Sequence, residues 1–452
     1  MSRSRIVLFL FSVIALLAVL CAVFPAEGVL GLRFPRLTDV LSASDARKGP
    51  SPEELLAQRR AAALAAEREQ FTAFFETDPA RFWLPDGDPA FFDSLFVALE
   101  QADSLPLRIL HYGDSQIEED RITGTIRSRL QARFGGSGPG MMPAREYATR
   151  QVGGGASAEL QRFFIYGDPA YRAGIRQYGP YGDFVRLDTA AVLSYYPVRS
   201  RAEERTCFDR VTLVAGNLRS ALTVRSRRDS CTVAPGESLS LIRFELPDSS
   251  VRASLTVSGH ADLYGVLLDG KSGVRMDNIA MRGSGGTFFT AMDPEQLRRF
   301  YAGENVRLLL LQFGGNNLPM LKTDRAVTEC LEATRRQIRH LQALAPRAKI
   351  IFIGPSDMST TVGGKRRTYP RLPAFVDSLK CSATQCGAAY WDIFGAMGGV
   401  DSMPDWVAAQ PPLAGPDYIH FTLAGAERVG TMFCDAFFLY YDYYRWRKEN
   451  ES

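Results

Sequence analysis

The chain opens with an apolar segment that runs from Ile6 to Ala26 without a charge and follows two arginines. Its length of about 21 residues is enough to span a bilayer as a helix. Positive charges before such a segment place the start of the chain in the cytoplasm and the remainder outside. We therefore expect residues 1–28 to form a signal-anchor in the inner membrane and the rest to be exported to the periplasm. A cleaved signal peptide is the alternative, although Phe24 and Ala26 make a poor cleavage site.

Residues 29–82 are expected to form a linker followed by a helix. The residues up to position 50 mix Pro, Gly, Ser and charges of both signs, which is typical of a linker. The stretch 51–75 then begins with Ser51 and a proline, and Glu54 completes a capping box. We predict a helix over 51–75 that serves as a spacer or packs on the body of the protein.

Two separate parts of the chain, 83–145 and 271–445, alternate apolar runs with segments of helical period. In the first part, the run LPLRIL leads into HYGDSQ, and Ile122, Ile126 and Leu130 then recur every four residues. In the second part, the runs VRLLLLQFG and AKIIFIGP alternate with amphipathic segments. Apolar strands that alternate with helices predict a mostly parallel sheet covered on both faces, with ligands bound at the carboxyl ends of its strands.

The pattern changes between about 146 and 270. Short alternating runs such as RVTLVAG, SALTVRS and ASLTVSG are separated by Gly, Asn, Asp and Pro residues. Turn signals at intervals of roughly 8–15 residues are typical of a β-sandwich. We expect residues 146–270 to form a β-sandwich inserted into a loop of the α/β domain.

Composition and charge are ordinary and bear mainly on which partners the protein binds. The 452 residues are 46% hydrophobic and 23% charged, with a net charge of +3, which is ordinary for a globular protein. Lysines and arginines are scattered, so nothing indicates nucleic-acid binding.

The cysteines and histidines bear on disulfides and metals. Of the seven cysteines, the pairs Cys381 with Cys386 and Cys207 with Cys231 are candidate disulfides in an oxidising compartment, and buried free thiols are the alternative. The four histidines are far apart and no CxxC pair is present, so no metal site is indicated.

Residues that carry chemistry follow the apolar strands. Ser115 in HYGDSQ needs an imidazole to take its proton and a carboxylate to orient that imidazole, and His420 with Asp417 just before the last helix is the best pair. Candidate oxyanion donors are the Ser115 amide, the Gly283 amide and the Asn316 side chain. Taken alone, Gly-Asp-Ser is an ordinary surface turn, and Asp114 is interpreted as a structural residue of that turn.

Together these motifs resemble the SGNH (GDSL-type) hydrolase superfamily. The matching blocks occur in the family's order, as GDS at 113–115, Gly283, GGN at 314–316 and DYIH at 417–420. The resemblance covers about 83–145 and 275–445, and Asn317 stands where the family usually has Asp. It implies a flavodoxin-like three-layer α/β/α sandwich with a mostly parallel sheet, and a Ser-His-Asp esterase that needs neither metal nor organic cofactor.

A narrower resemblance lies in GDSQIEEDRITGTIRSRLQARFGGSGPG. This stretch is similar to peptidoglycan O-acetylesterases and related exported acetyl transferases, which carry a carbohydrate-binding-like β-sandwich where the predicted insert lies. The resemblance implies an exported esterase that removes small acyl groups, acetyl above all, from sugar hydroxyls of a cell-envelope or other polysaccharide. Its partners would be an acetylated glycan and, through the first segment, the membrane.

Two alternatives and two weaker candidate residues stay open. The same site would serve an O-acetyltransferase, and a chain that had lost catalysis would be an anchored glycan-binding protein. Tyr369 and Trp406 lie in loops ahead of His420 and are candidates to stack on a sugar ring, or to pack within their loops.

Overall fold

The computed structural model describes residues 3–23, 38, 51–149, 151–198, 206–236 and 239–451. The chain divides into two compact units, residues 1–73 and 74–452, and each is described by itself. Most of the expected linker before position 51 lies outside the described residues.

The first unit contains an apolar helix and most of a charged one. Helix α1 (Arg3–Val23) includes a segment of 20 residues, Ser4–Val23, whose length and composition suffice to cross a membrane. Helix α3 (Pro52–Thr77) begins with the expected capping box, because the Glu54 amide donates to Ser51 Oγ at 3.1 Å and the Ser51 amide donates to the Glu54 carboxylate at 2.6 Å. This predicted helix start is confirmed.

A six-stranded sheet forms the centre of the second unit. Its order is β1-β20-β17-β16-β2-β15, and every neighbouring pair is parallel except β1 with β20. The mostly parallel sheet is therefore confirmed. The strands are β1 (Phe82–Trp83), β2 (Leu107–Gly113), β15 (Val274–Ala280), β16 (Val306–Gln312), β17 (Lys349–Ile353) and β20 (Ala389–Trp391).

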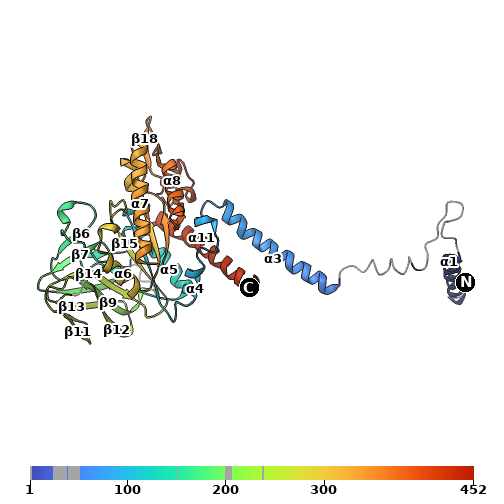
Figure 1. Ribbon diagram of the computed structural model, residues 1–452, viewed down its shortest axis with the longest axis horizontal. Helices are drawn as coiled ribbons and strands as arrows, with labels where there is room; N and C mark the ends of the chain where they lie inside the picture. Colours follow the sequence, from blue (N-terminus) through green and yellow to red (C-terminus); the bar gives the residue numbers. More distant parts are fainter. Residues whose placement is uncertain are drawn as a thin grey trace. The chain divides into compact units, whose positions relative to one another are not determined.

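Helices cover both faces of this sheet because side chains alternate along each strand. Leu110 and Leu309 face the core beneath α6 (Pro294–Gly303), α7 (Asp324–Leu344) and α8 (Leu372–Gln385). Ile109 and Leu308 face the core beneath α4 (Asp93–Glu100), α5 (Thr123–Phe134) and α11 (Leu423–Asn450). The result is the three-layer α/β/α arrangement, in which α7 and α8 are drawn in orange and α11 in red (Figure 1).

Shorter elements complete this part of the unit. The hairpin β18–β19 follows β17, and helices α9 and α10 precede the loop that leads to α11. The bounds of these elements are β18 (Ser359–Val362), β19 (Lys365–Thr368), α9 (Ile393–Ala396) and α10 (Ser402–Ala408). The 3-10 helices of the unit are η1 (Pro85–Gly87), η2 (Ser115–Asp120), η5 (Phe289–Ala291), η6 (Gly315–Met320) and, between β6 and β7, η3 (Pro169–Tyr171).

Two antiparallel sheets lie between α5 and β15 in the chain, where the alternating pattern predicts strands. One has the order β11-β10-β13-β8-β5-β4, and the other the order β12-β9-β14-β7-β6 with β3 added beside β14. Residues of both sheets, such as Leu193 and Leu213, share one hydrophobic core. The strands are β3 (Gly140–Met142), β4 (Tyr147–Ala148), β5 (Val152–Ala156), β6 (Gln161–Phe164), β7 (Asp183–Leu187), β8 (Ala190–Pro197), β9 (Phe208–Gly216), β10 (Leu222–Arg225), β11 (Ser230–Val233), β12 (Ser240–Ser250), β13 (Ala253–Ser258) and β14 (Ala261–Asp269).

A buried ion-pair network joins these sheets to the main sheet. Arg108 of β2 donates to Asp277 of β15 at 2.6 Å, to Glu304 after α6 at 3.0 Å, and to Asp269 at the end of β14. Burial alone would lower the pKa of Arg108, but the three carboxylates raise it well above its ordinary value. One guanidinium therefore ties together strands from different sheets.

The two expected disulfides are wrong, because all seven cysteines are free. Cys381 is exposed on α8, whereas Cys386 is buried at its C-terminal end. Five positions on a helix amount to a rotation of about 140° between side chains, so the two thiols face different surroundings. Cys207 precedes β9 and Cys231 lies in β11, and these strands belong to different sheets. All four cysteines are free thiols, as in the alternative, but of these four only Cys386 is buried.

Candidate active site

The site lies where the order of the parallel strands reverses. Along the chain β2 comes first, β15 second and β16 third, yet β2 lies between the other two in the sheet. Ligands in such sheets bind at this switch point, outside the carboxyl ends of the strands. A pocket of about 210 Å³ opens there. Its lining residues are Asp114, Ser115, Gln116, Gln312, Phe313, Gly315, Asn316, Pro319, Gly354, Pro355, Ser356, Met358, Tyr369, Ile419 and His420.

Ser115 and His420 of this pocket form a hydrogen-bonded chain with Asp417, which lies behind His420. Ser115 Oγ is 2.8 Å from His420 Nε2, and His420 Nδ1 is 2.7 Å from Asp417 Oδ2. Burial alone would raise the pKa of Asp417, but hydrogen bonds from His420 and from the amide of Ile419 lower it below its usual value. The carboxylate is therefore ionised at neutral pH and fixes the tautomer of the imidazole that faces Ser115.

Local backbone geometry presents Ser115 at the end of β2. A side chain at Gly113 would meet Ile117 Cδ1 at 2.8 Å, so a glycine permits the tight turn. Asp114 Oδ1 accepts from the Gln116 amide at 3.0 Å and caps η2. Ser115 is the first residue of η2, and the first amides of such a turn have no partner within it. The Ser115 amide is thereby placed as a donor beside its own hydroxyl.

The loop that carries His420 is also held from within. Gly415 N–H donates to the His420 carbonyl at 2.8 Å, and Ala414 and Phe421 form an isolated antiparallel bridge. Thr422 then caps α11 by accepting from the Gly425 amide at 3.2 Å. The imidazole is therefore presented by a closed loop directly before a long helix.

Gln116 and Arg121 connect the Ser115 turn to the His420 loop. Gln116 Nε2 donates to the Ile419 carbonyl at 2.7 Å, and its Oε1 accepts from the Phe421 amide at 3.2 Å. Arg121 donates to the carbonyls of Ser115 at 2.6 Å and Phe421 at 3.1 Å. Sequence reasoning missed both residues, because side-chain bonds to a distant backbone leave no motif.

Asn316 is brought to the pocket, with both of its amide protons engaged. Its Nδ2 donates to Asp114 Oδ2 at 3.0 Å and to the Ser284 carbonyl at 3.2 Å. Burial raises the pKa of Asp114 to about 6, although the bond from Gln116 and the nearby His420 oppose this. The next residue, Asn317, donates to the Gly285 carbonyl at 3.3 Å. The two asparagines thus hold one short loop beside the pocket.

The other candidate residues have different positions. Tyr369 lines the pocket, as a substrate-contacting residue must. Gly283, with φ +76°, does not line it but lines a neighbouring cavity, so its oxyanion role stays a prediction. The prediction that Trp406 stacks on a sugar ring is wrong, because its side chain is only 7% exposed. Its indole packs on Phe421 at 5.3 Å and donates to the Met397 carbonyl, so it is part of the core.

Comparisons with known proteins found one matching family model and several matching solved structures. The GDSL-like lipase/acylhydrolase family model matches residues 248–428, a range that includes Asn316, Asp417 and His420 but not Ser115. A solved structure of a peptidoglycan O-acetylesterase matches with a TM-score of 0.63 and 19% identity, over 81% of this chain and 99% of that one. At this identity the match shows the shared fold.

Two further solved structures have lower scores. A family two carbohydrate esterase from Cellvibrio japonicus has a TM-score of 0.26 and 11% identity, over 64% of this chain and 98% of that one. The periplasmic domain of a lipopolysaccharide acetyltransferase from Salmonella ser. Paratyphi A has a TM-score of 0.27 and 13% identity, over 37% and 74%. No curated protein sequence matches the chain.

Proposed function

We propose that this chain is an SGNH (GDSL-type) carboxylic ester hydrolase that removes acetyl groups from sugar hydroxyls of a cell-envelope polysaccharide, as the family match over residues 248–428 and the fold shared with a peptidoglycan O-acetylesterase support. The observation that carries the proposal is the hydrogen-bonded chain from Ser115 Oγ through His420 to Asp417, at 2.8 Å and 2.7 Å. The matched peptidoglycan O-acetylesterase supports an acetylated glycan of the peptidoglycan type as the substrate.

The proposed reaction has two steps. Ser115 Oγ attacks the ester carbonyl while His420 Nε2 takes its proton, and Asp417 holds the imidazolium that forms. His420 then gives this proton to the departing sugar oxygen, which leaves an acetylated Ser115. In the second step His420 activates a water that attacks the acetyl carbonyl and releases acetate. These transfers need no metal and no organic cofactor.

The oxyanion of each step requires preorganised donors. We assign this role to the Ser115 amide, the Asn316 side chain and the predicted Gly283 amide. Asn316 Nδ2 already donates twice, so the oxyanion takes the place of the Ser284 carbonyl while the bond to Asp114 Oδ2 keeps the amide oriented. Each such donor contributes about 3–4 kcal/mol to lowering the barrier.

The size of the pocket supports a small acyl group. Its volume is about 210 Å³, and its apolar walls include Phe313, Met358 and Ile419. Pockets that enclose drug-sized ligands measure about 300–1,000 Å³, so the space suits an acetyl group better than a fatty acyl chain.

The domain organisation and the location of the protein are parts of the same proposal. We assign 1–28 to a signal-anchor that holds the enzyme at the periplasmic side of the inner membrane, and 29–82 to a linker and helix. The hydrolase domain comprises 83–145 and 271–445. The remaining segment, 146–270, is the carbohydrate-binding-like β-sandwich, which two antiparallel sheets with a common core support.

Replacing Gln116 with alanine is expected to lower kcat for 4-nitrophenyl acetate by about 10- to 100-fold, because misplacing a catalytic group by about 1 Å has effects of this size. Gln116 positions His420 by bonding to the backbone on either side of it. KM and the melting temperature should therefore stay close to those of the wild type. The Gln116→Glu variant keeps the acceptor for the Phe421 amide but sets a carboxylate oxygen against the Ile419 carbonyl, so it should also lose activity. An unchanged kcat in Gln116→Ala would contradict this positioning role.

Measuring the release of acetate distinguishes ester hydrolysis from acetyl transfer. The full-length chain in detergent is expected to release acetate from O-acetylated peptidoglycan faster than it acetylates an added deacetylated glycan. Faster transfer than release would make the protein an O-acetyltransferase. Glycan binding without turnover of any ester would instead support an anchored glycan-binding protein.

A further inference from the structure

A second cavity, of about 470 Å³, lies next to the active-site loop. One wall comes from the segment between β6 and β7, which includes Ile165, Tyr166, Arg172 and Tyr178. The other wall comes from the segment between β15 and α6, at 283–291. The antiparallel sheets and the hydrolase sheet therefore build this cavity together.

A hydrogen bond connects the lining of the second cavity to the lining of the Ser115 pocket. Ser284 and Gly285 line the cavity, while their carbonyls accept from Asn316 at 3.2 Å and from Asn317 at 3.3 Å. Asn316 in turn lines the Ser115 pocket. A glycan chain that filled both the Ser115 pocket and the second cavity would pass over the loop at Ser284 and Gly285.

A row of aromatic rings runs from the cavity's outer side to the Ser115 pocket. Tyr171, which is 50% exposed, stacks on Phe164 at 5.0 Å, and Phe164 lies 5.2 Å from Tyr166. The row continues through Phe288 to Phe313, with centroid distances of 6.3 Å for both the Tyr166–Phe288 and the Phe288–Phe313 pairs. Phe313 lines the Ser115 pocket. Phe288 and Phe313 are only 7% and 3% exposed, so they hold the row in place, and the partly exposed Tyr166 offers the face on which a sugar ring stacks.

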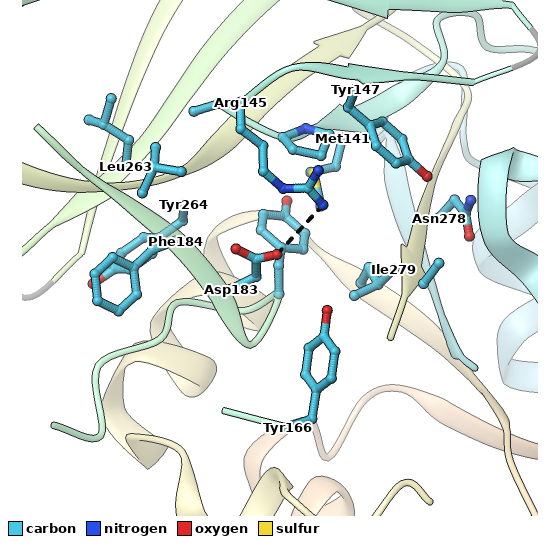
Figure 2. Close-up of a pocket in the computed structure, with 15 residues that line it drawn as sticks. Met141, Arg145, Tyr147, Tyr166, Asp183, Phe184, Leu263, Tyr264, Asn278 and Ile279 are labelled. Carbon is cyan, nitrogen blue, oxygen red and sulfur yellow. Dashed lines mark ion pairs between the residues drawn. The ribbon is translucent and has the colours of Figure 1, made fainter. Parts of the chain in front are cut away.

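Tyr166 is fixed in this row by its polar end. Arg162 donates to Tyr166 Oη at 3.2 Å and to Asp183 Oδ2 at 2.9 Å, and Arg145 forms an ion pair with Asp183 at 3.8 Å. Figure 2 shows the Tyr166 hydroxyl pointing toward Asp183 and Arg145 in the adjoining pocket. Burial raises the pKa of Tyr166 to about 12, so the ring stays neutral.

Arg172 gives the second cavity its charge. Its side chain is exposed and forms no ion pair with any residue that the structure describes. Among the described residues that line the cavity there is no Asp or Glu. An unpaired guanidinium in an otherwise uncharged aromatic cavity is matched by a carboxylate, which it can bind through two hydrogen bonds.

We propose that this cavity is a subsite for a carboxylate-bearing group of the glycan, beside the acetyl ester that lies at Ser115. The proposal rests on the proposed esterase function and extends it to the substrate class, which is an acidic acetylated glycan. Tyr166 supplies the stacking surface in the cavity wall, and Arg172 binds the carboxylate.

The test compares Arg172→Ala with Arg172→Lys and with Arg227→Ala in the full-length chain. Arg227 is a matched control, because it is exposed and lines a separate groove of about 630 Å³ between the antiparallel strands. The probes are O-acetylated peptidoglycan fragments, the same fragments after reduction of their carboxyl groups to alcohols, and 4-nitrophenyl acetate. Direct binding of the deacetylated fragments is measured by calorimetry on the same variants.

Arg172→Ala is expected to lower kcat/KM on the acidic fragments by about tenfold, as the loss of one charge-assisted hydrogen-bonding partner would. Turnover of 4-nitrophenyl acetate and of the reduced fragments should not change, and Arg172→Lys should recover part of the loss. Equal turnover of acidic fragments by wild type and Arg172→Ala, or an equal loss in Arg227→Ala, would overturn the subsite. Binding that depends on Arg172 without any ester turnover would support the subsite and overturn the esterase function.

Discussion

Replacing Ser115 with alanine is expected to lower kcat for 4-nitrophenyl acetate by about 10⁴-fold or more in the full-length chain. The variant loses the attacking oxygen, which lies 2.8 Å from His420 Nε2, and keeps the pocket and the oxyanion donors. Asp417→Asn is expected to have an effect of similar size, because an amide stabilises the wrong tautomer of His420. Steady-state kinetics with equal amounts of each folded variant measure both losses.

Ser378→Ala is the matched control for this loss. Ser378 lies on α8, and its hydroxyl donates to the Ala374 carbonyl of the same helix at 2.8 Å. This variant should retain the wild-type kcat. Comparable activity in Ser115→Ala and Ser378→Ala would end the assignment of Ser115 as the nucleophile.

Replacing Arg108 with methionine is expected to lower the free energy of unfolding by about 3–5 kcal/mol, which is typical when one partner of a buried ion pair is removed. Arg108 is the common partner of Asp269, Asp277 and Glu304, all of them buried. Glu304 keeps Arg243 at 2.5 Å, but Asp269 and Asp277 pair with no other cation among the described residues, so the variant leaves two buried carboxylates without an ion-pair partner. Guanidinium unfolding followed by tryptophan fluorescence measures the loss.

The pH dependence of this loss identifies its cause. Burial raises the pKa of Asp277 to about 6 even with Arg108 beside it, and removing the guanidinium raises that pKa further. A carboxylate whose folded pKa exceeds its unfolded value stabilises the fold when protonated, and this stability is lost as the pH rises through the folded pKa. The deficit of Arg108→Met should therefore shrink between about pH 7 and about pH 5.

An exposed ion pair provides the control for Arg108. Arg325 is 88% exposed and pairs with Glu329 one turn along α7 at 2.8 Å. Arg325→Met should change the free energy of unfolding by less than about 0.5 kcal/mol. A deficit in Arg108→Met that matched this control, or that grew toward low pH, would contradict the role of the network.

The strands that sequence patterns predict are those with apolar residues on both faces. β2, β16 and β17 read as unbroken apolar runs because helices cover both sides of the sheet. β15 was missed because VRMDNIA contains Arg275, Asp277 and Asn278. Asp277 is buried only because Arg108 of the neighbouring strand neutralises it, and no local pattern contains that partner.

In the candidate site, too, some features were predictable from the sequence and others were not. The order of the motifs sufficed to predict that Ser115, Asp417 and His420 meet, because each follows a strand or precedes a helix at one edge of the sheet. The bonds that fix their spacing were not predictable, since Gln116 contacts backbone atoms of Ile419 and Phe421 rather than a characteristic side chain. The sugar-stacking role of Trp406 was wrong because an aromatic residue after a glycine-rich stretch resembles a substrate rim, whereas Trp406 lies in helix α10 and packs into the core.

Covalent labelling of the nucleophile tests the account most directly. The full-length chain is treated with diisopropyl fluorophosphate, digested and examined by mass spectrometry. We predict a single diisopropylphosphoryl group on Ser115, formed in step with the loss of esterase activity and slowed strongly in His420→Ala. Loss of activity with the label on another residue, or equal labelling of Ser115 in His420→Ala, would contradict the Ser115–His420–Asp417 mechanism.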